Sequence, residues 1–217
     1  MYFIGDVHGR FERYQYIIKN NKIDHSIQLG DMGIGFPTGN KEYNFDNKTF
    51  APDIGDNHRF IRGNHDDPEL CMKHPRYLGD YGYIEQNDIF YLSGGLSIDK
   101  HCRIEFIDWW RNEELNLLSL QNASELYEQH KPSIIVSHEC PTEIKIKIGG
   151  MHKLKYISTT ERLLQHLLEI HRPKYWIFGH YHKKEIIEID GTTFVVLDEL
   201  IRGKEKDCIF EIPNVKF

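Results

Sequence analysis

Short apolar runs alternate along this chain with longer stretches in which apolar residues recur every three to four positions. Five runs have the length and composition of buried strands: 2–4, 26–29, 59–61, 133–136 and 175–178. Three stretches have the spacing of amphipathic helices: 10–22, 113–130 and 160–171. Strands that alternate with helices in this way predict an α/β fold.

The middle and the end of the chain have a different pattern. Three short apolar runs, separated by Asn-Asp and Gly-Gly pairs, are expected to form strands: 83–84, 89–92 and 104–107. The runs 186–189 and 193–197 flank Asp190-Gly191, a dipeptide typical of tight hairpin turns. We therefore expect strands that follow one another directly in these regions, in addition to the strand–helix units.

Two segments have less regular patterns. Residues 33–55 are rich in Gly, Asn, Asp and Pro and have no period, so we expect a long loop of the kind that often covers a binding site. Residues 142–158 contain an Ile-Lys-Ile-Lys-Ile alternation, which indicates a hairpin or a mobile flap. No linker or repeat interrupts the chain, and we expect one domain over residues 1–217.

Composition restricts the class of protein. A chain of 217 residues with 40% apolar content is long enough to bury a full α/β core. A net charge of -6 argues against a stable nucleic-acid partner, which needs a basic surface. No apolar run reaches the roughly 18 residues that span a membrane. The four cysteines form no CxxC pair and no charged leader precedes the first strand, so we expect a cytoplasmic protein with reduced thiols.

Polar clusters follow five of the predicted strands, and ligands in open α/β sheets bind at the carboxyl ends of strands. Taken singly, an Asp-x-His pair carries little weight, because Asp56/His58 and Asp99/His101 have the same spacing, and turn or capping roles are common for such residues. Five strand ends with the same chemistry are together specific for a site. The candidate ligands are Asp6, His8, Asp31, Asn64, His138, His180 and His182.

The donor types indicate which ions these residues would hold. Oxygen and imidazole ligands without a thiolate suit Mn, Fe, Zn or Ni, of which we favour Mn. Seven ligands are too many for one tetrahedral ion and are appropriate for two divalent ions that share a carboxylate. We therefore expect a pair of divalent metal ions.

The order of these clusters resembles the calcineurin-like metallophosphoesterase superfamily. The matching stretches are Gly5-Asp6-Val7-His8-Gly9, Gly30-Asp31-Met32-Gly33, Gly63-Asn64-His65-Asp66, Ser137-His138 and Gly179-His180-Tyr181-His182. The resemblance covers essentially the whole chain. It implies a four-layer α/β/β/α sandwich of two mixed β-sheets flanked by helices. It also implies one ion on Asp6, His8, Asp31 and His182, and another on Asp31, Asn64, His138 and His180, with a hydroxide between the metals.

The expected activity is hydrolysis of phosphomonoesters, phosphodiesters or both, by in-line attack of that hydroxide on phosphorus. His65, next to a ligand, would protonate the leaving oxygen, and its alternative role is to orient the metal site. Arg10 and Arg62 flank two of the clusters, and each is either a phosphate-binding residue or an ordinary surface arginine.

This chain departs from the protein-phosphatase branch of the superfamily. There the second cluster continues with an Asp that holds the catalytic His and an Arg that binds phosphate, whereas this chain has Ile34 and Gly35. That departure weakens the Ser/Thr phosphatase alternative. The two histidines of the last cluster resemble the phosphodiesterase branch and the smaller bacterial and phage branches. Ser97-Ile98-Asp99 and the stretch 109–113 resemble metallophosphoesterases of bacteria and phages.

Two further alternatives remain. A nuclease of the same superfamily is disfavoured by the net charge of -6 and by a length that leaves no room for the capping domain of that branch. A non-catalytic scaffold on this fold is disfavoured because all seven candidate ligands and His65 are present.

Overall fold

The computed structural model of the chain describes residues 1–37, 55–149, 157–213 and 215. The helices are α1 (Phe11–Asn20), α2 (Pro68–Lys73), α3 (Leu117–His130), α4 (Thr142–Gly149) and α5 (Thr159–Ile170), with short 3-10 turns at Glu85–Asn87 and Lys100–Cys102. The strands are β1 (Tyr2–Ile4), β2 (Ser26–Leu29), β3 (His58–Ile61), β4 (Tyr81–Ile84), β5 (Ile89–Leu92), β6 (Ile134–Ser137), β7 (Tyr175–Phe178), β8 (Glu185–Ile189), β9 (Thr192–Val196) and β10 (Ile209–Glu211).

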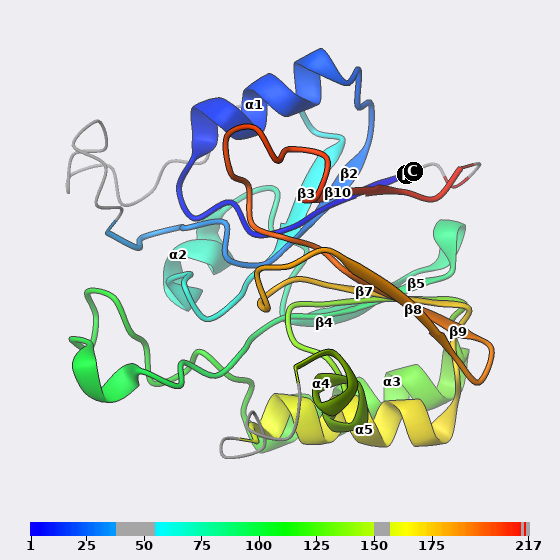
Figure 1. Cartoon of the computed structure of the whole chain (residues 1–217). Helices are drawn as coiled ribbons and strands as arrows, with labels where there is room; N and C mark the ends of the chain where they lie inside the picture. Colours follow the sequence, from blue (N-terminus) through cyan, green and yellow to red (C-terminus); the bar gives the residue numbers. More distant parts are fainter. Residues whose placement is uncertain (38–54, 150–156, 214, 216–217) are drawn as a thin grey trace.

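The strands form two mixed sheets that stack on each other (Figure 1). The first has the order β10-β1-β2-β3, in which β1, β2 and β3 are parallel and β10 is antiparallel. The second has the order β4-β5-β6-β7-β9-β8, with a parallel centre and an antiparallel strand at each edge. Helices α1 and α2 cover the first sheet, and α3, α4 and α5 cover the second. The expected four-layer α/β/β/α sandwich is confirmed.

Alternation along the strands explains why both sheets are buried on two faces. In β7, Ile177 packs between the sheets, whereas its neighbours Trp176 and Phe178 pack against the helices α3 and α5. In β9, Val195 faces the other sheet and Phe194 faces the helical layer. Successive side chains of a strand point to opposite faces, so a continuous apolar run supplies two cores at once.

Two structural expectations are wrong. Residues 142–149 form helix α4 and not a hairpin. Ile144 and Ile148 are four residues apart and both are buried in the core shared with α5, while Lys145 pairs with Glu161 at 2.5 Å. The Ile-Lys alternation is therefore also compatible with a helix. Ile144 and Ile148, spaced i and i+4, lie on its buried face, and the ion pair of Lys145 also favours the helix.

The expected strand at 104–107 is a turn. Ile104 and Phe106 are 62% and 73% exposed, so this apolar run is not part of a core. The side chain of Asp108 accepts a hydrogen bond from the Ile104 amide at 2.6 Å, and the Ile107 amide donates to the Ile104 carbonyl at 3.1 Å. Local side-chain hydrogen bonds of this kind compete with strand pairing.

Other elements differ at their ends or were not expected. The helix expected from 113 begins at Leu117, where the Asn116 side chain accepts a hydrogen bond from the Ser119 amide. Helix α2 and strand β10 were not expected at all. Most of the expected 33–55 loop and residues 150–156 of the expected 142–158 flap lie outside the described residues. Within the described part of the chain, no helix has the length and apolar content needed to cross a membrane.

Candidate metal centre

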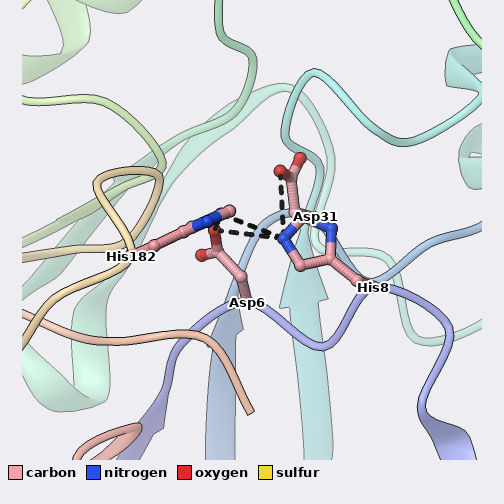
Figure 2. Close-up of side chains that lie close together, drawn as sticks. All are labelled: Asp6, His8, Asp31 and His182. Carbon is pink, nitrogen blue, oxygen red and sulfur yellow. Dashed lines mark hydrogen bonds and ion pairs between the residues drawn. The ribbon is translucent and has the colours of Figure 1, made fainter. Parts of the chain in front are cut away.

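All seven predicted ligands lie together where strands of both sheets end. Asp6, Asp31 and Asn64 follow the parallel strands β1, β2 and β3, whereas His138 and His180 follow β6 and β7. The ligand atoms form two groups, each with all its atoms within 4.8 Å of one another: Asp6, His8, Asp31 and His182 in one, and Asp31, His138 and His180 in the other. Figure 2 shows the side chains of the first group pointing toward one another. Asp31 belongs to both groups.

The first group is held by contacts between its own members. The Nε2 atom of His182 lies 3.1 Å from Asp6 Oδ2 and 3.1 Å from His8 Nε2. His8 Nε2 is 3.9 Å from Asp31 Oδ2. The Asp6 carboxylate is fully buried and also accepts the backbone N–H of His180, at 3.1 Å. The Nε2 atoms of two imidazoles therefore converge with two carboxylate oxygens.

The second group is oriented by contacts behind it. His138 directs Nδ1 to the Leu29 carbonyl at 2.8 Å, which leaves Nε2 facing Asp31 Oδ1 at 3.3 Å and His180 Nδ1 at 3.1 Å. Asn64 joins this group, because its Oδ1 is 3.2 Å from His138 Nε2. A hydrogen bond that fixes one ring nitrogen and frees the other is usual for histidines that bind metals.

The backbone of the centre is strained. His8, Asp31, His180 and His182 all have positive φ values, of 50°, 55°, 66° and 47°. Residues other than glycine rarely adopt this conformation, and those that do cluster at functional sites. The tight turns after the strands therefore aim these four side chains at one place.

Two glycines permit the close approach of the strand ends. A Cβ on Gly63 would lie 2.1 Å from Asp31 Oδ1 and 2.6 Å from His138 Nε2. A Cβ on Gly179 would lie 2.2 Å from Asp6 Oδ1. The Gly that precedes the ligand in these two clusters thus leaves the space that the carboxylates occupy.

A buried carboxylate beside the centre connects two of the turns. Asp66 accepts backbone N–H groups from Gly33 at 2.7 Å, Ile34 at 2.9 Å, Gly63 at 2.9 Å and Met32 at 3.2 Å. Burial and the neighbouring Asp31 charge raise its pKa. Asp66 therefore ties the turn after β2 to the turn after β3.

The charged groups of the centre shift one another's pKa. Burial alone would raise the pKa of Asp6, but the hydrogen bond to His182 and the charge of His138 lower it. Burial also opposes ionisation of Asp31, whose pKa is nevertheless lowered strongly by the surrounding histidines. The hydrogen bond to Asp6 raises the pKa of His182 to about 9, whereas burial and the nearby His138 lower the pKa of His180 to about 3. The site thus favours ionised carboxylates next to imidazoles.

The donor set fits two divalent cations. Four histidines, two aspartates and an amide oxygen supply nitrogen and oxygen donors without a thiolate, and they fall into two groups that share one carboxylate. Divalent ions of the Mn, Fe, Zn and Ni type accept such mixed ligands.

His65 lies beside the centre. Its backbone N–H donates to Asp31 Oδ1 at 2.8 Å, and its Nδ1 is 3.9 Å from Asp31 Oδ2. Burial lowers its pKa to about 4. Ile34, the position at which the protein-phosphatase branch has its Asp, is buried in the core below α1 and offers no carboxylate to this ring.

The two predicted phosphate-binding arginines are paired with acidic groups. Arg62 is buried and donates to Asp80 Oδ1 at 2.8 Å and to the Glu113 carbonyl at 2.6 Å. Arg10 is 37% exposed and contacts Glu199 at 2.9 Å, and Glu199 in turn lies 3.6 Å from His182 Nδ1. Arg10 is thus near the first group of ligands, and its contact with phosphate stays a prediction, as does that of Arg62.

The other Asp-x-His pairs do not join the centre. His58 begins β3, at the opposite end of the strand, and its Nδ1 lies 2.9 Å from Ser26 Oγ. Asp99 instead binds the guanidinium of Arg103. The sequence assigned no site role to Arg103, which contacts His65, or to Ser97, whose Oγ accepts from Asn64 at 3.1 Å. The only sequence signal for Arg103 was its i, i+4 spacing from Asp99, which is common and weak.

Solved structures of other proteins share this fold. A dimetal phosphatase from Danio rerio has a TM-score of 0.53 over 95% of this chain and 90% of that chain, at 12% identity. The phosphopantetheinyl hydrolase of Mycobacterium tuberculosis has a TM-score of 0.51 over 98% and 95% of the two chains, at 10% identity. The TT1561 protein of Thermus thermophilus has a TM-score of 0.50 over 92% and 89%, at 12% identity. Identities this low show the fold alone.

Sequence comparison identifies the family. Among curated protein sequences, none matches this chain. A sequence model of the calcineurin-like phosphoesterases matches residues 1–184, a range that contains all five polar clusters. This match agrees with the two mixed sheets and with the two groups of metal-binding side chains. The chain therefore belongs to the calcineurin-like phosphoesterase family.

Proposed function

We propose that this phosphoesterase hydrolyses phosphomonoesters, phosphodiesters or both at a centre of two divalent metal ions. The observation that carries the proposal is the sharing of Asp31 between two groups of donors at one edge of the sandwich. In this assignment one ion is held by Asp6, His8, Asp31 and His182, and the other by Asp31, Asn64, His138 and His180. Two such ions, when bound, activate water for in-line attack and neutralise the phosphoryl oxygens.

The side chains around the ions have separate roles in this proposal. His65 stands beside the centre as the N–H hydrogen-bond donor to the leaving oxygen, because a ring whose pKa is lowered to about 4 is neutral near pH 7. Arg10 is better placed than Arg62 to contact phosphate, because it is partly exposed and lies close to His182 through Glu199. Arg62 is buried between Asp80 and Glu113, contacts that support a bracing role.

The identity of the metal ion and the location of the protein are proposed from the chemistry of its side chains. We propose Mn²⁺ as the resident ion, from the mixed oxygen and imidazole donors. We also propose a cytoplasmic location, which the four unpaired cysteines support.

A paired assay tests the function. With Mn²⁺ present, we expect hydrolysis of 4-nitrophenyl phosphate, of bis(4-nitrophenyl) phosphate or of both, and none of single-stranded DNA. Metal analysis of the same sample is expected to give two ions per chain. Two bound ions without hydrolysis of any ester would indicate a scaffold, and cleavage of the DNA alone would indicate a nuclease.

Two histidine variants, one at the site and one as a control, test the role proposed for His65. We expect His65→Asn to lower kcat by about 10²–10⁴-fold while both metal ions stay bound. His101→Asn is the matched control, because His101 is exposed and belongs to another Asp-x-His pair of the chain, and it should leave turnover unchanged. Unchanged turnover of His65→Asn on an ester with a poor leaving group would remove His65 from this role.

A further inference from the structure

The ring of His65 is held on two sides by side chains outside the metal centre. Phe36 stacks on its face, with ring centroids 4.5 Å apart and an interplanar angle of 4°. Arg103 lies at its edge, with Nη2 2.8 Å from His65 Nε2. The remaining ring nitrogen, Nδ1, faces the centre, 3.9 Å from Asp31 Oδ2. The ring therefore has one nitrogen toward the arginine and one toward the proposed reaction.

Arg103 is itself rigidly fixed. Its Nε and Nη2 donate to the two oxygens of Asp99, each at 2.8 Å, and its Nη1 donates to the Asp108 carbonyl at 3.1 Å. The guanidinium carbon lies 5.4 Å from the centroid of the Phe36 ring. The side chain is 11% exposed. A planar fork held by a carboxylate and a carbonyl has little freedom to move.

These contacts determine which nitrogen of His65 carries hydrogen toward the centre. A guanidinium has only donors and stays charged in proteins, so in this contact Nε2 of His65 is the acceptor. The hydrogen bond made by one ring nitrogen sets the protonation of the other, which places the N–H on Nδ1. That N–H points to the side of the ring on which Asp31 lies.

We propose that Arg103 is a positioning residue, which holds His65 so that its Nδ1–H is directed at the leaving oxygen of the phosphate ester. This inference rests on the proposed phosphoesterase function. Direct binding of phosphate by Arg103 is disfavoured, because four of its five N–H groups are already engaged by Asp99, Asp108 and His65. Arg103 therefore acts through His65.

Kinetics of two arginine variants test the proposal. Arg103→Met removes the donor, and Arg111→Met is the control from the same segment, because Arg111 is 81% exposed and pairs only with Glu105 among the acidic groups described. We expect Arg103→Met to lower kcat on phenyl phosphate at least tenfold, with a smaller loss on 4-nitrophenyl phosphate, an unchanged KM and two bound ions. Arg103→Lys, which keeps a cationic donor, should recover part of the loss. Arg111→Met should resemble the wild type.

A double variant separates action through His65 from direct action on the substrate. In a His65→Asn background, adding Arg103→Met should change kcat by less than about twofold, because residues that act as one unit are non-additive. An equal loss in both backgrounds, or a rise in KM alone, would overturn the proposal in favour of direct phosphate binding. No effect of Arg103→Met on an active enzyme would overturn it as well.

A measurement on the metal-free protein tests the proposal without an activity assay. Nitrogen-15 NMR of the imidazole rings distinguishes the two tautomers. We expect His65 to carry its hydrogen on Nδ1 in the wild type and in Arg111→Met, and to gain the Nε2–H form in Arg103→Met. A wild-type ring with hydrogen on Nε2 would overturn the positioning role. A metal-loaded wild type that hydrolyses no ester would instead contradict the proposed function, so the two failures are distinguishable.

Discussion

Asp31 is the residue on which both halves of the centre depend. Its oxygens face His8 at 3.9 Å on one side and His138 at 3.3 Å on the other, and its Oδ1 also accepts the backbone N–H of His65. It is almost fully buried, so its negative charge is stable only because these partners surround it. The same carboxylate thus organises the proposed metal pair and the ring beside it.

His182 makes metal binding depend on pH. Its pKa is raised to about 9 by the hydrogen bond to Asp6, so the metal-free protein carries a proton on this ring near pH 7. A bound cation requires the neutral imidazole, so binding releases that proton and the apparent affinity rises as the pH approaches 9. His180 contributes no such release near neutrality, because its pKa is lowered to about 3.

Titration calorimetry with Mn²⁺ in two buffers of different ionisation enthalpy measures this release. We predict a binding enthalpy that depends on the buffer near pH 7, and a weaker dependence for His182→Asn. A binding enthalpy that is identical in both buffers would show that metal binding removes no proton from His182.

At the residue scale, the sequence was informative where polar residues follow strands. The seven candidate ligands are brought together because the parallel strands that carry them end at one edge. The contact between Arg103 and His65 was not predictable, because it joins two segments 38 residues apart through irregular structure. Periodicity carries no signal for such a contact.

The turns that follow β2 and β3 are connected to each other through the side chain of Asp66. It accepts N–H groups from the turns after β2 and β3, and those turns carry Asp31 and Asn64. Buried backbone N–H groups that lose their acceptor cost free energy, so the side chain that accepts them holds both turns in place. The position of the shared ligand therefore depends on a side chain that is not itself in either group of ligands.

We predict that Asp66→Asn lowers the free energy of unfolding of the metal-free protein by about 1.5–3 kcal/mol, because the amide nitrogen cannot accept these N–H groups. We also predict a loss of about 10–100-fold in metal affinity, as for other groups that support ligands. Urea denaturation and Mn²⁺ titration measure the two effects.

Asp67→Asn is the matched control for that experiment. Asp67 caps α2 by accepting from the Glu69 and Leu70 amides, and Asn is an equally good cap, so this variant should match the wild type. Equal behaviour of the two variants would contradict the role given to Asp66.

The elements that the sequence predicted well are those with one dominant period. Strands β1, β2, β6 and β7 agree with their apolar runs to within about one residue. The Ile-Lys alternation at 142–149 also matches a helical face, and the pairing of Lys145 with Glu161 belongs to tertiary structure. Strand β10 is three residues long and pairs with β1, a distant contact that no local pattern shows.

At the scale of the whole molecule, the centre lies where two sheets meet. The first sheet supplies Asp6, Asp31 and Asn64, and the second supplies His138 and His180, so neither sheet alone contains a complete group of ligands. The core between the sheets, which includes Ile27, Val136 and Ile177, therefore determines the distance between the two sets of side chains.

Periodicity alone predicted only an α/β fold, and the four layers followed from the family resemblance. Assigning strands to two sheets requires contacts between residues far apart in the chain. β9, for example, lies between β7 and β8 in the second sheet.

Anomalous diffraction from crystals of the Mn²⁺-loaded protein tests the central claim most directly. We predict two manganese peaks about 3.5–4 Å apart, one bound by Asp6, His8, Asp31 and His182 and the other by Asp31, Asn64, His138 and His180. A single ion, or ions held by other side chains, would contradict the account.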